Sequence, residues 1–125
     1  MAGDREGPIQ KQIVDWLRAV LPPECVVHFA KGEINKRGKQ FMIEQARAKR
    51  LGALSGFPDL IVLPYASAGG ACFLEVKAKG GYPSKGQKEM HERLRKLGYR
   101  VAVVRSVDDA RAALAEWAIG TRERK

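Results

Sequence analysis

The chain has 125 residues, of which 45% are hydrophobic and 30% charged, and its formal net charge is +9. This length suits one domain with its own core, so we expect a single domain over residues 1–125, with flexible ends at 1–7 and 119–125. The positive charge favours a polyanionic partner such as nucleic acid. No apolar run is long enough for a membrane span, and the N-terminus lacks the apolar stretch of a secretory signal.

The cysteine content argues against a disulfide framework and against a zinc site. Cys25 and Cys72 both fall in apolar, strand-like runs, where a reduced cytoplasmic protein carries buried thiols. No Cys-X-X-Cys pair occurs, and Cys25 with His28 offers too few ligands for zinc. We therefore expect a cytoplasmic protein without a small-molecule cofactor. His28 has two possible roles: an ordinary strand histidine with satisfied hydrogen bonds, or a catalytic base.

The first half of the chain predicts a helix, a strand and a second helix. Apolar residues at helical spacing predict an amphipathic helix over 8–21, which Pro22 and Pro23 end. An apolar run predicts a strand over 25–30, and good helix formers predict a helix over 41–54. Between them, the segment 31–40 is rich in Lys, Gly and Asn, so it predicts a mobile loop. This loop is either an ordinary solvated segment or an arm that contacts phosphates.

The second half predicts two neighbouring strands and then a helix, a strand and a last helix. The runs 60–63 and 71–74 are rich in Ile, Val, Leu and Phe, and the link between them contains Ser and Gly, which indicates a hairpin. A helix is expected to begin at Ser84 and to close at Gly98, a strand to cover 99–104, and a final helix to follow Ser106. The first of these helices has a predicted packing stripe of Gln87, Met90/His91, Leu94 and Leu97. The order helix, strand, helix, strand, strand, helix, strand, helix predicts an α/β fold with a mixed central sheet flanked by helices.

Charged residues stand at the ends of the two neighbouring strands. Asp59 opens the first strand, and side chains alternate along the second, so Glu75 and Lys77 share one face. Two converging carboxylates repel each other unless a cation or proton lies between them, and Mg²⁺ prefers such oxygen ligands. The plain alternative is a surface ion pair of Glu75 with Lys77 and a turn-capping Asp59.

The spacing of these residues carries a family resemblance. Pro58-Asp59, fifteen further residues, and Glu75-Val76-Lys77 follow the Pro-Asp…(Asp/Glu)-X-Lys signature of restriction-endonuclease-like nucleases. More narrowly, the chain resembles the VRR-NUC family, in its stand-alone phage or bacterial type. The resemblance spans about residues 6–117 and is carried by Gly56-Phe-Pro-Asp59-Leu-Ile-Val, Phe73-Leu-Glu75-Val-Lys77, Ser84-x-x-Gln87 and Leu97-Gly-Tyr-Arg-Val-Ala-Val-Val104.

The resemblance implies a restriction-endonuclease-like core and a metal-dependent endodeoxyribonuclease. Asp59, Glu75 and the Val76 carbonyl would hold one or two Mg²⁺ or Mn²⁺ ions. Lys77 would orient the attacking water or steady charge on the phosphate, and hydrolysis would leave 5′-phosphate and 3′-hydroxyl ends. Such stand-alone proteins tend to be homodimers that cut branched DNA, such as four-way (Holliday) junctions.

Two further site residues come from the family pattern, and each has a plain alternative. Glu6 matches a glutamate of the family's first helix and would complete the metal shell, but it could equally be a solvated acid favoured by the helix dipole. Gln87 matches an active-site glutamine, but Ser84-x-x-Gln87 is also a capping-box pattern. Candidate nucleic-acid contacts are Lys31, Lys36, Arg37, Lys39, Lys79 and Lys85.

Three other functions are compatible with this sequence. A non-catalytic nucleic-acid-binding module on the same fold would have little use for clustered acids that face a polyanion. A nuclease of another specificity would cut flaps or a short sequence, although no base-reading element is identifiable. A structural partner of a replication complex would show no metal dependence.

Overall fold

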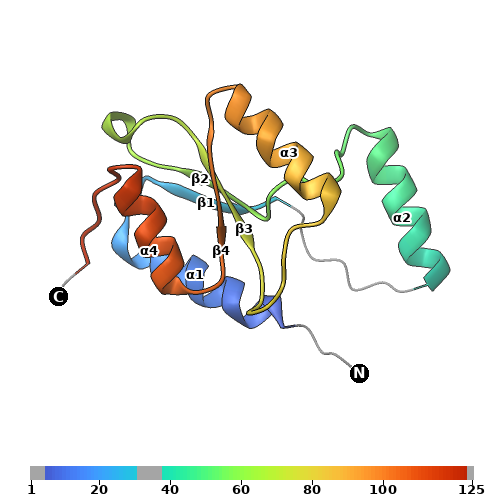
Figure 1. Cartoon of the computed structure of the whole chain (residues 1–125), viewed down its shortest axis with the longest axis horizontal. Coiled ribbons are helices and arrows are strands. Elements are labelled where there is room, and N and C mark those ends of the chain that lie inside the picture. Colours follow the sequence, from blue (N-terminus) through green and yellow to red (C-terminus); the bar gives the residue numbers. More distant parts are fainter. Residues whose placement is uncertain (1–4, 31–37, 124–125) are drawn as a thin grey trace.

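The computed structural model describes residues 5–30 and 38–123, and its element order follows the predicted alternation (Figure 1). The fold is α/β, as predicted, with one addition, a short 3₁₀ helix η1 between the two hairpin strands. The helices are α1 (Glu6–Val20), α2 (Gly38–Arg50), α3 (Lys85–Lys96) and α4 (Val107–Glu116). The strands are β1 (Val26–Phe29), β2 (Leu60–Leu63), β3 (Cys72–Val76) and β4 (Arg100–Val104). The short helix η1 covers Ala66–Ala68.

The four strands form one mixed sheet in the order β1-β2-β3-β4. β1 pairs with β2 and β2 with β3 in antiparallel fashion, which confirms the predicted hairpin. β3 and β4 are parallel, because α3 carries the chain back between them. β3 is therefore a central strand, and all five of its residues are buried.

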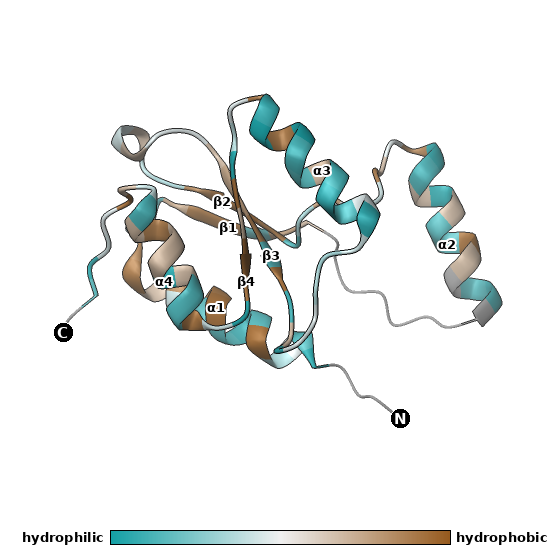
Figure 2. Cartoon of the chain, in the orientation of Figure 1, coloured by the Kyte–Doolittle hydropathy of each residue, from teal (hydrophilic) through white to brown (hydrophobic). Residues whose placement is uncertain are grey.

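Each face of the sheet is covered by a different part of the chain (Figure 1). α1 and α4 pack on one face around a large apolar core that includes Leu17, Leu74 and Leu114. On the other face, a smaller cluster joins Phe73 of β3 to Met90 and Leu94 of α3. Figure 2 shows hydrophobic colours along the strands and hydrophilic colours over much of α3. The alternation predicted for β3 is thus confirmed, since Phe73 and Leu74 belong to opposite cores.

Two helices begin earlier than the sequence pattern predicts. α1 begins at Glu6, so Pro8 lies in the first turn, where backbone N–H groups have no partner within the helix and proline costs little. Glu6 is therefore an acidic residue of that first turn. α2 begins at Gly38, so Lys39 belongs to this helix and not to the predicted loop. Residues 31–37, where most of that loop was expected, lie outside the described residues.

α3 is capped as its sequence predicts. The Ser84 hydroxyl accepts a hydrogen bond from the Gln87 backbone N–H, and the Gln87 side chain accepts one from the Ser84 N–H. Met90, His91 and Leu94 of the predicted packing stripe are buried. Leu97 was expected to extend this stripe, but it is exposed, because the helix ends at Lys96 and the next residue leaves the helical path.

The segment after α4 packs back onto the molecule. Ile119 is buried, and the carboxylate of Glu123 accepts a hydrogen bond from the Trp16 indole at 2.9 Å. The guanidinium of Arg111 donates two more hydrogen bonds to Glu123. These bonds, above all those from Arg111, lower the pKa of Glu123 from 4.5 to about 2. Within the described residues, no helix is long and apolar enough to cross a membrane.

Candidate active site

The sheet register brings Asp59 and Glu75 face to face. In the β2–β3 pair, Leu60 lies opposite Leu74. Continuing this register by one residue places Asp59, which precedes Leu60, opposite Glu75, which follows Leu74. A side-chain contact supports this extension, because the Val76 backbone N–H donates to Asp59 Oδ2 at 2.7 Å. Residues directly opposite in an antiparallel pair have Cβ atoms roughly 5 Å apart and point to the same face. The two predicted carboxylates therefore lie at the same end of two neighbouring strands.

Glu75 is a buried carboxylate that is held by α3. Its side chain is 1% exposed. Oε2 accepts a hydrogen bond from Gln87 Nε2 at 3.3 Å, and Oε1 lies 3.1 Å from His91 Nε2. Burying a charged carboxylate is costly unless it is hydrogen-bonded, so these contacts explain how β3 tolerates a buried acid near its C-terminal end. A surface ion pair, the plain alternative for Glu75, is thereby ruled out.

Gln87 caps α3, as its sequence pattern predicts, and its side chain also contacts Glu75. Its carbonyl oxygen accepts from the Ser84 N–H at 2.8 Å and completes the cap of α3. Its amide nitrogen points the other way and donates to Glu75. The Ser84 N–H can only donate, so it fixes which end of the amide is oxygen. One side chain thus joins the start of α3 to the centre of the sheet.

Lys77 and Glu6 lie near each other just beyond the end of β3. Lys77 directly follows β3, and its N–H donates to the Val104 carbonyl at 3.0 Å, which continues the pairing with β4. Its Nζ lies 4.0 Å from Glu6 Oε2 at the start of α1. The Lys77 side chain is 14% exposed, so the amine is partly shielded from water. Lys77 therefore lies near Glu6, and it is separated by one residue from Glu75 and follows Val76, whose N–H binds Asp59.

Two exposed lysines are close in sequence to the candidate residues, and a third is on α2, which lies to the side of the layered core. Lys79 and Lys85 are exposed, one just after Lys77 and the other in the first turn of α3, and Lys39 is exposed on α2. Lys31, Lys36 and Arg37 lie outside the described residues. Tyr82 is exposed in the same connection, and the Arg105 guanidinium lies over its ring at 5.1 Å from the centroid.

Sequence analysis did not predict the contact that His91 makes with Glu75. The sequence placed it only in the packing stripe of α3. A signal was available, since Gln87 and His91 are four residues apart and so lie on one face of the helix. Its partner could not be read from the pattern, because Glu75 lies 16 residues earlier on another element. The other histidine, His28, lies exposed on β1.

The donor set at this end of the sheet fits a hard cation. Mg²⁺ is usually bound through one or two carboxylates together with water and substrate phosphate, which matches Asp59 and Glu75. Zinc sites require more protein ligands. Across residues 5–30 and 38–123, no three His, Cys, Asp or Glu side chains gather in a way that could hold a metal ion. The two carboxylates are therefore compatible with Mg²⁺ or Mn²⁺.

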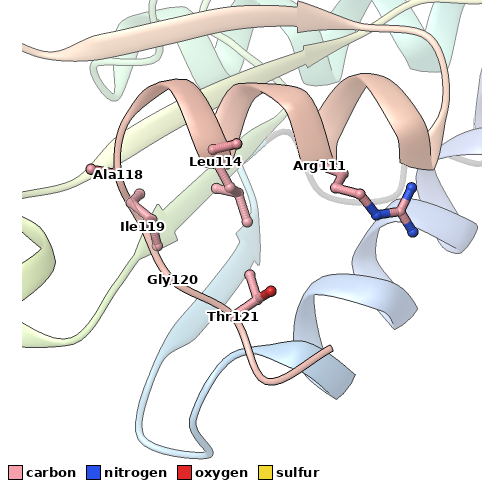
Figure 3. Close-up of a pocket in the computed structure, with 7 residues that line it drawn as sticks. Arg111, Leu114, Ala118, Ile119, Gly120 and Thr121 are labelled. Atoms are coloured by element: carbon pink, nitrogen blue, oxygen red, sulfur yellow. The ribbon is translucent and has the colours of Figure 1, made fainter. Parts of the chain in front are cut away.

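A hollow elsewhere on the surface is unrelated to this chemistry. It has a volume of about 360 Å³ and lies at the C-terminal end of α4, where Figure 3 shows Leu114, Ile119 and Thr121 at its wall. α4 covers the face of the sheet opposite to α3. The hollow therefore shares no residue with the carboxylate site.

Comparisons with known proteins agree with this geometry. The model of the VRR-NUC domain family matches residues 4–108. A solved structure titled "VRR_NUC domain protein" superposes with a TM-score of 0.62 at 24% identity, covering 96% of this chain and 93% of its own. Another, titled "VRR_NUC domain", gives a TM-score of 0.59 at 27% identity, covering 91% and 97%. No curated protein sequence matches the chain.

The family match covers both β-strands that carry the carboxylates, Lys77, and the whole of α3. VRR-NUC domains are nuclease-type domains that act on DNA and generally depend on divalent metals. The chain belongs to the VRR-NUC domain family.

Proposed function

We propose that this protein is a metal-dependent endonuclease that hydrolyses phosphodiester bonds of branched DNA at Asp59, Glu75 and Lys77. The observation that carries the proposal is the hydrogen bond between Asp59 Oδ2 and the Val76 N–H, at 2.7 Å. It ties the aspartate to the peptide that joins Glu75 to Val76, one residue before Lys77. This bond supports a shared site for the three residues of the family signature.

The carboxylates of Asp59 and Glu75 would hold one or two Mg²⁺ or Mn²⁺ ions. The Val76 carbonyl is a further oxygen at the same end of β3, and Glu6 would add its carboxylate directly or through water. When bound, a divalent cation polarises the scissile phosphate and makes a water molecule a better nucleophile at neutral pH. The buried Glu75 favours this role, because a cation offsets the repulsion between two converging acids.

Lys77 and Gln87 would act on the water and the phosphate. The Lys77 amine carries three N–H donors and can orient a water molecule or steady the negative charge that develops on the phosphate. Its distance of 4.0 Å from Glu6 Oε2 leaves the pair without a close hydrogen bond. The Gln87 amide stands within reach of Glu75 and would position water or phosphate beside it.

Charge around the site supports DNA as the substrate. The exposed Lys39, Lys79 and Lys85 are suited to phosphate contacts, and Lys31, Lys36 and Arg37 would add to them. The exposed ring of Tyr82 offers a stacking surface for an unpaired base.

A homodimer would place two such sites on the two strands of a junction. Several large apolar side chains in and just after α2 are exposed, which supports self-association through this segment. They are Met42, Ile43, Leu51 and Leu54. Figure 1 shows α2 to the side of the layered core.

A cleavage panel tests this proposal. Linear duplex, single strand, flap, splayed arm and four-way junction are each incubated with protein and Mg²⁺, Mn²⁺ or chelator. We expect cleavage only with metal, and fastest on the four-way junction. Faster cutting of flaps or of a short duplex sequence would assign another specificity. Binding without any cleavage would make the domain a non-catalytic binding module.

The oligomeric state is tested separately, by light scattering after gel filtration. We expect a mass of twice 13.8 kDa, and a shift towards monomer in the double variant Ile43→Ser with Leu51→Ser. Leu97→Ser is the matched control, because Leu97 is exposed to the same degree as Leu51 but lies at the end of α3. A monomeric wild-type protein would contradict the dimer.

A further inference from the structure

His91 is a buried polar residue in an otherwise apolar cluster. Its side chain is 3% exposed and packs on the face of the sheet where Phe73, Met90 and Leu94 form the smaller core. A buried polar group in such a place lowers stability unless it is hydrogen-bonded. The partner is Glu75, whose Oε1 lies 3.1 Å from His91 Nε2. A carboxylate that binds a divalent cation is ionised and can only accept, so the proposed function assigns the hydrogen of this bond to Nε2.

α3 supplies one donor to each oxygen of Glu75. Gln87 Nε2 donates to Oε2, and His91 Nε2 donates to Oε1 one helical turn later. Two donors at different oxygens restrict the rotation of a carboxylate more than a single bond would. Because Gln87 and His91 are fixed on one rigid helix, the plane of the Glu75 carboxylate is set by the position of α3.

We propose that His91 is a positioning residue that holds the Glu75 carboxylate in the orientation needed to share a divalent cation with Asp59. This inference rests on the proposed function. A carboxylate has about four lone-pair positions, so accepting these hydrogen bonds is compatible with metal coordination. Partners that orient a ligating carboxylate commonly matter about 10- to 100-fold for metal affinity or activity.

The proposal separates His91 from a residue that only fills the core. Replacing it with leucine keeps an apolar side chain of similar reach but removes the donor to Oε1. Replacing it with glutamine removes the ring but offers an amide N–H that can reach the same oxygen. Only a positioning role predicts that the polar variant retains metal affinity and the apolar variant loses it.

The experiment measures Mn²⁺ binding by isothermal titration calorimetry, without DNA, on the full chain. We expect His91→Leu to weaken Mn²⁺ binding about 10- to 100-fold, and His91→Gln to restore most of that loss. Leu94→Ala is the matched control, because it removes a buried side chain of the same helix and cluster without touching Glu75. We expect it to lower the melting temperature and to leave Mn²⁺ affinity unchanged.

The outcomes distinguish failure of this inference from failure of the proposed function. If wild-type protein binds Mn²⁺ and cuts junctions but His91→Leu binds Mn²⁺ equally well, the positioning role is refuted and the nuclease stands. The same holds if His91→Gln is as weak as His91→Leu, or if Leu94→Ala weakens binding as much. If the wild-type chain neither binds Mn²⁺ nor cuts, both proposals fall. Should His91→Leu fail to fold, the comparison of His91→Gln with wild type and Leu94→Ala still decides.

Discussion

Gly56 controls how closely the turn before β2 approaches α3. Its φ is +81°, and a Cβ at this position would lie 2.6 Å from the Gly86 carbonyl oxygen and 3.1 Å from the Gln87 backbone nitrogen. The neighbouring atoms belong to the backbone of the capped first turn of α3, so they cannot move aside cheaply. Gly56→Ala therefore has two costs, a strained backbone and a steric clash.

The size of each cost follows from these two features. A non-glycine residue in left-handed backbone costs about 1–2 kcal/mol, and forcing an extra carbon into packed structure costs about 1–3 kcal/mol. We expect Gly56→Ala to lower the free energy of unfolding by about 2–5 kcal/mol in total. Moving α3 also moves Gln87, whose contact with Glu75 is already long at 3.3 Å. Mn²⁺ affinity should therefore fall as well.

Urea denaturation of two matched glycine variants separates the cost of backbone strain from the cost of the steric clash. Gly98 has a φ of +92° and open space around it, so Gly98→Ala measures backbone strain alone. Gly86 also has open space and an ordinary φ, so Gly86→Ala should change stability by less than about 1 kcal/mol. If Gly56→Ala is no less stable than Gly98→Ala, the close approach to α3 has no energetic consequence and the argument is wrong.

Three further predictions concern chemistry, substrate binding and the C-terminal segment. Lys77→Ala should slow junction cleavage about 10²- to 10³-fold while DNA binding by fluorescence anisotropy is retained; undiminished cutting would exclude the role given to the amine. Neutralising Lys36, Arg37 and Lys39 together should reduce the slope of log affinity against log salt by about 2–3, and an unchanged slope would mean that these cations do not meet phosphates. The Glu123 carboxyl should titrate by NMR near pH 2, and nearer its usual 4.5 in Arg111→Ala. Because folding lowers this pKa, the stabilisation is present above pH 4.5 and is lost as the pH falls towards 2; a Glu123 midpoint that Arg111→Ala leaves in place would contradict the pairing.

The parts of the fold that sequence could predict are those set by local pattern. Alternation along β3 placed Phe73 and Leu74 on opposite faces, and both cores of the structure agree. The Ser84-x-x-Gln87 pattern predicted the capped start of α3, since all its partners lie within four residues. Asp59 and Glu75 could be placed together because they border two neighbouring strands of a short hairpin.

Contacts between distant residues were beyond reach of the sequence. The bond from Trp16 to Glu123 joins residues 107 positions apart, and no periodicity in either segment indicates it. The sequence pattern placed His91 on the packing face of its helix, but its contact with Glu75 depends on how α3 lies across the sheet. Glu6 was ambiguous for a related reason, because only the start of α1 at that residue brings it near Lys77.

The most direct test is the position of a metal ion in crystals grown with Mn²⁺, located by anomalous scattering. We expect a peak about 2.1 Å from a carboxylate oxygen of Asp59 and from one of Glu75. A cleavage-competent protein whose Mn²⁺ peak lies away from both residues would contradict the account.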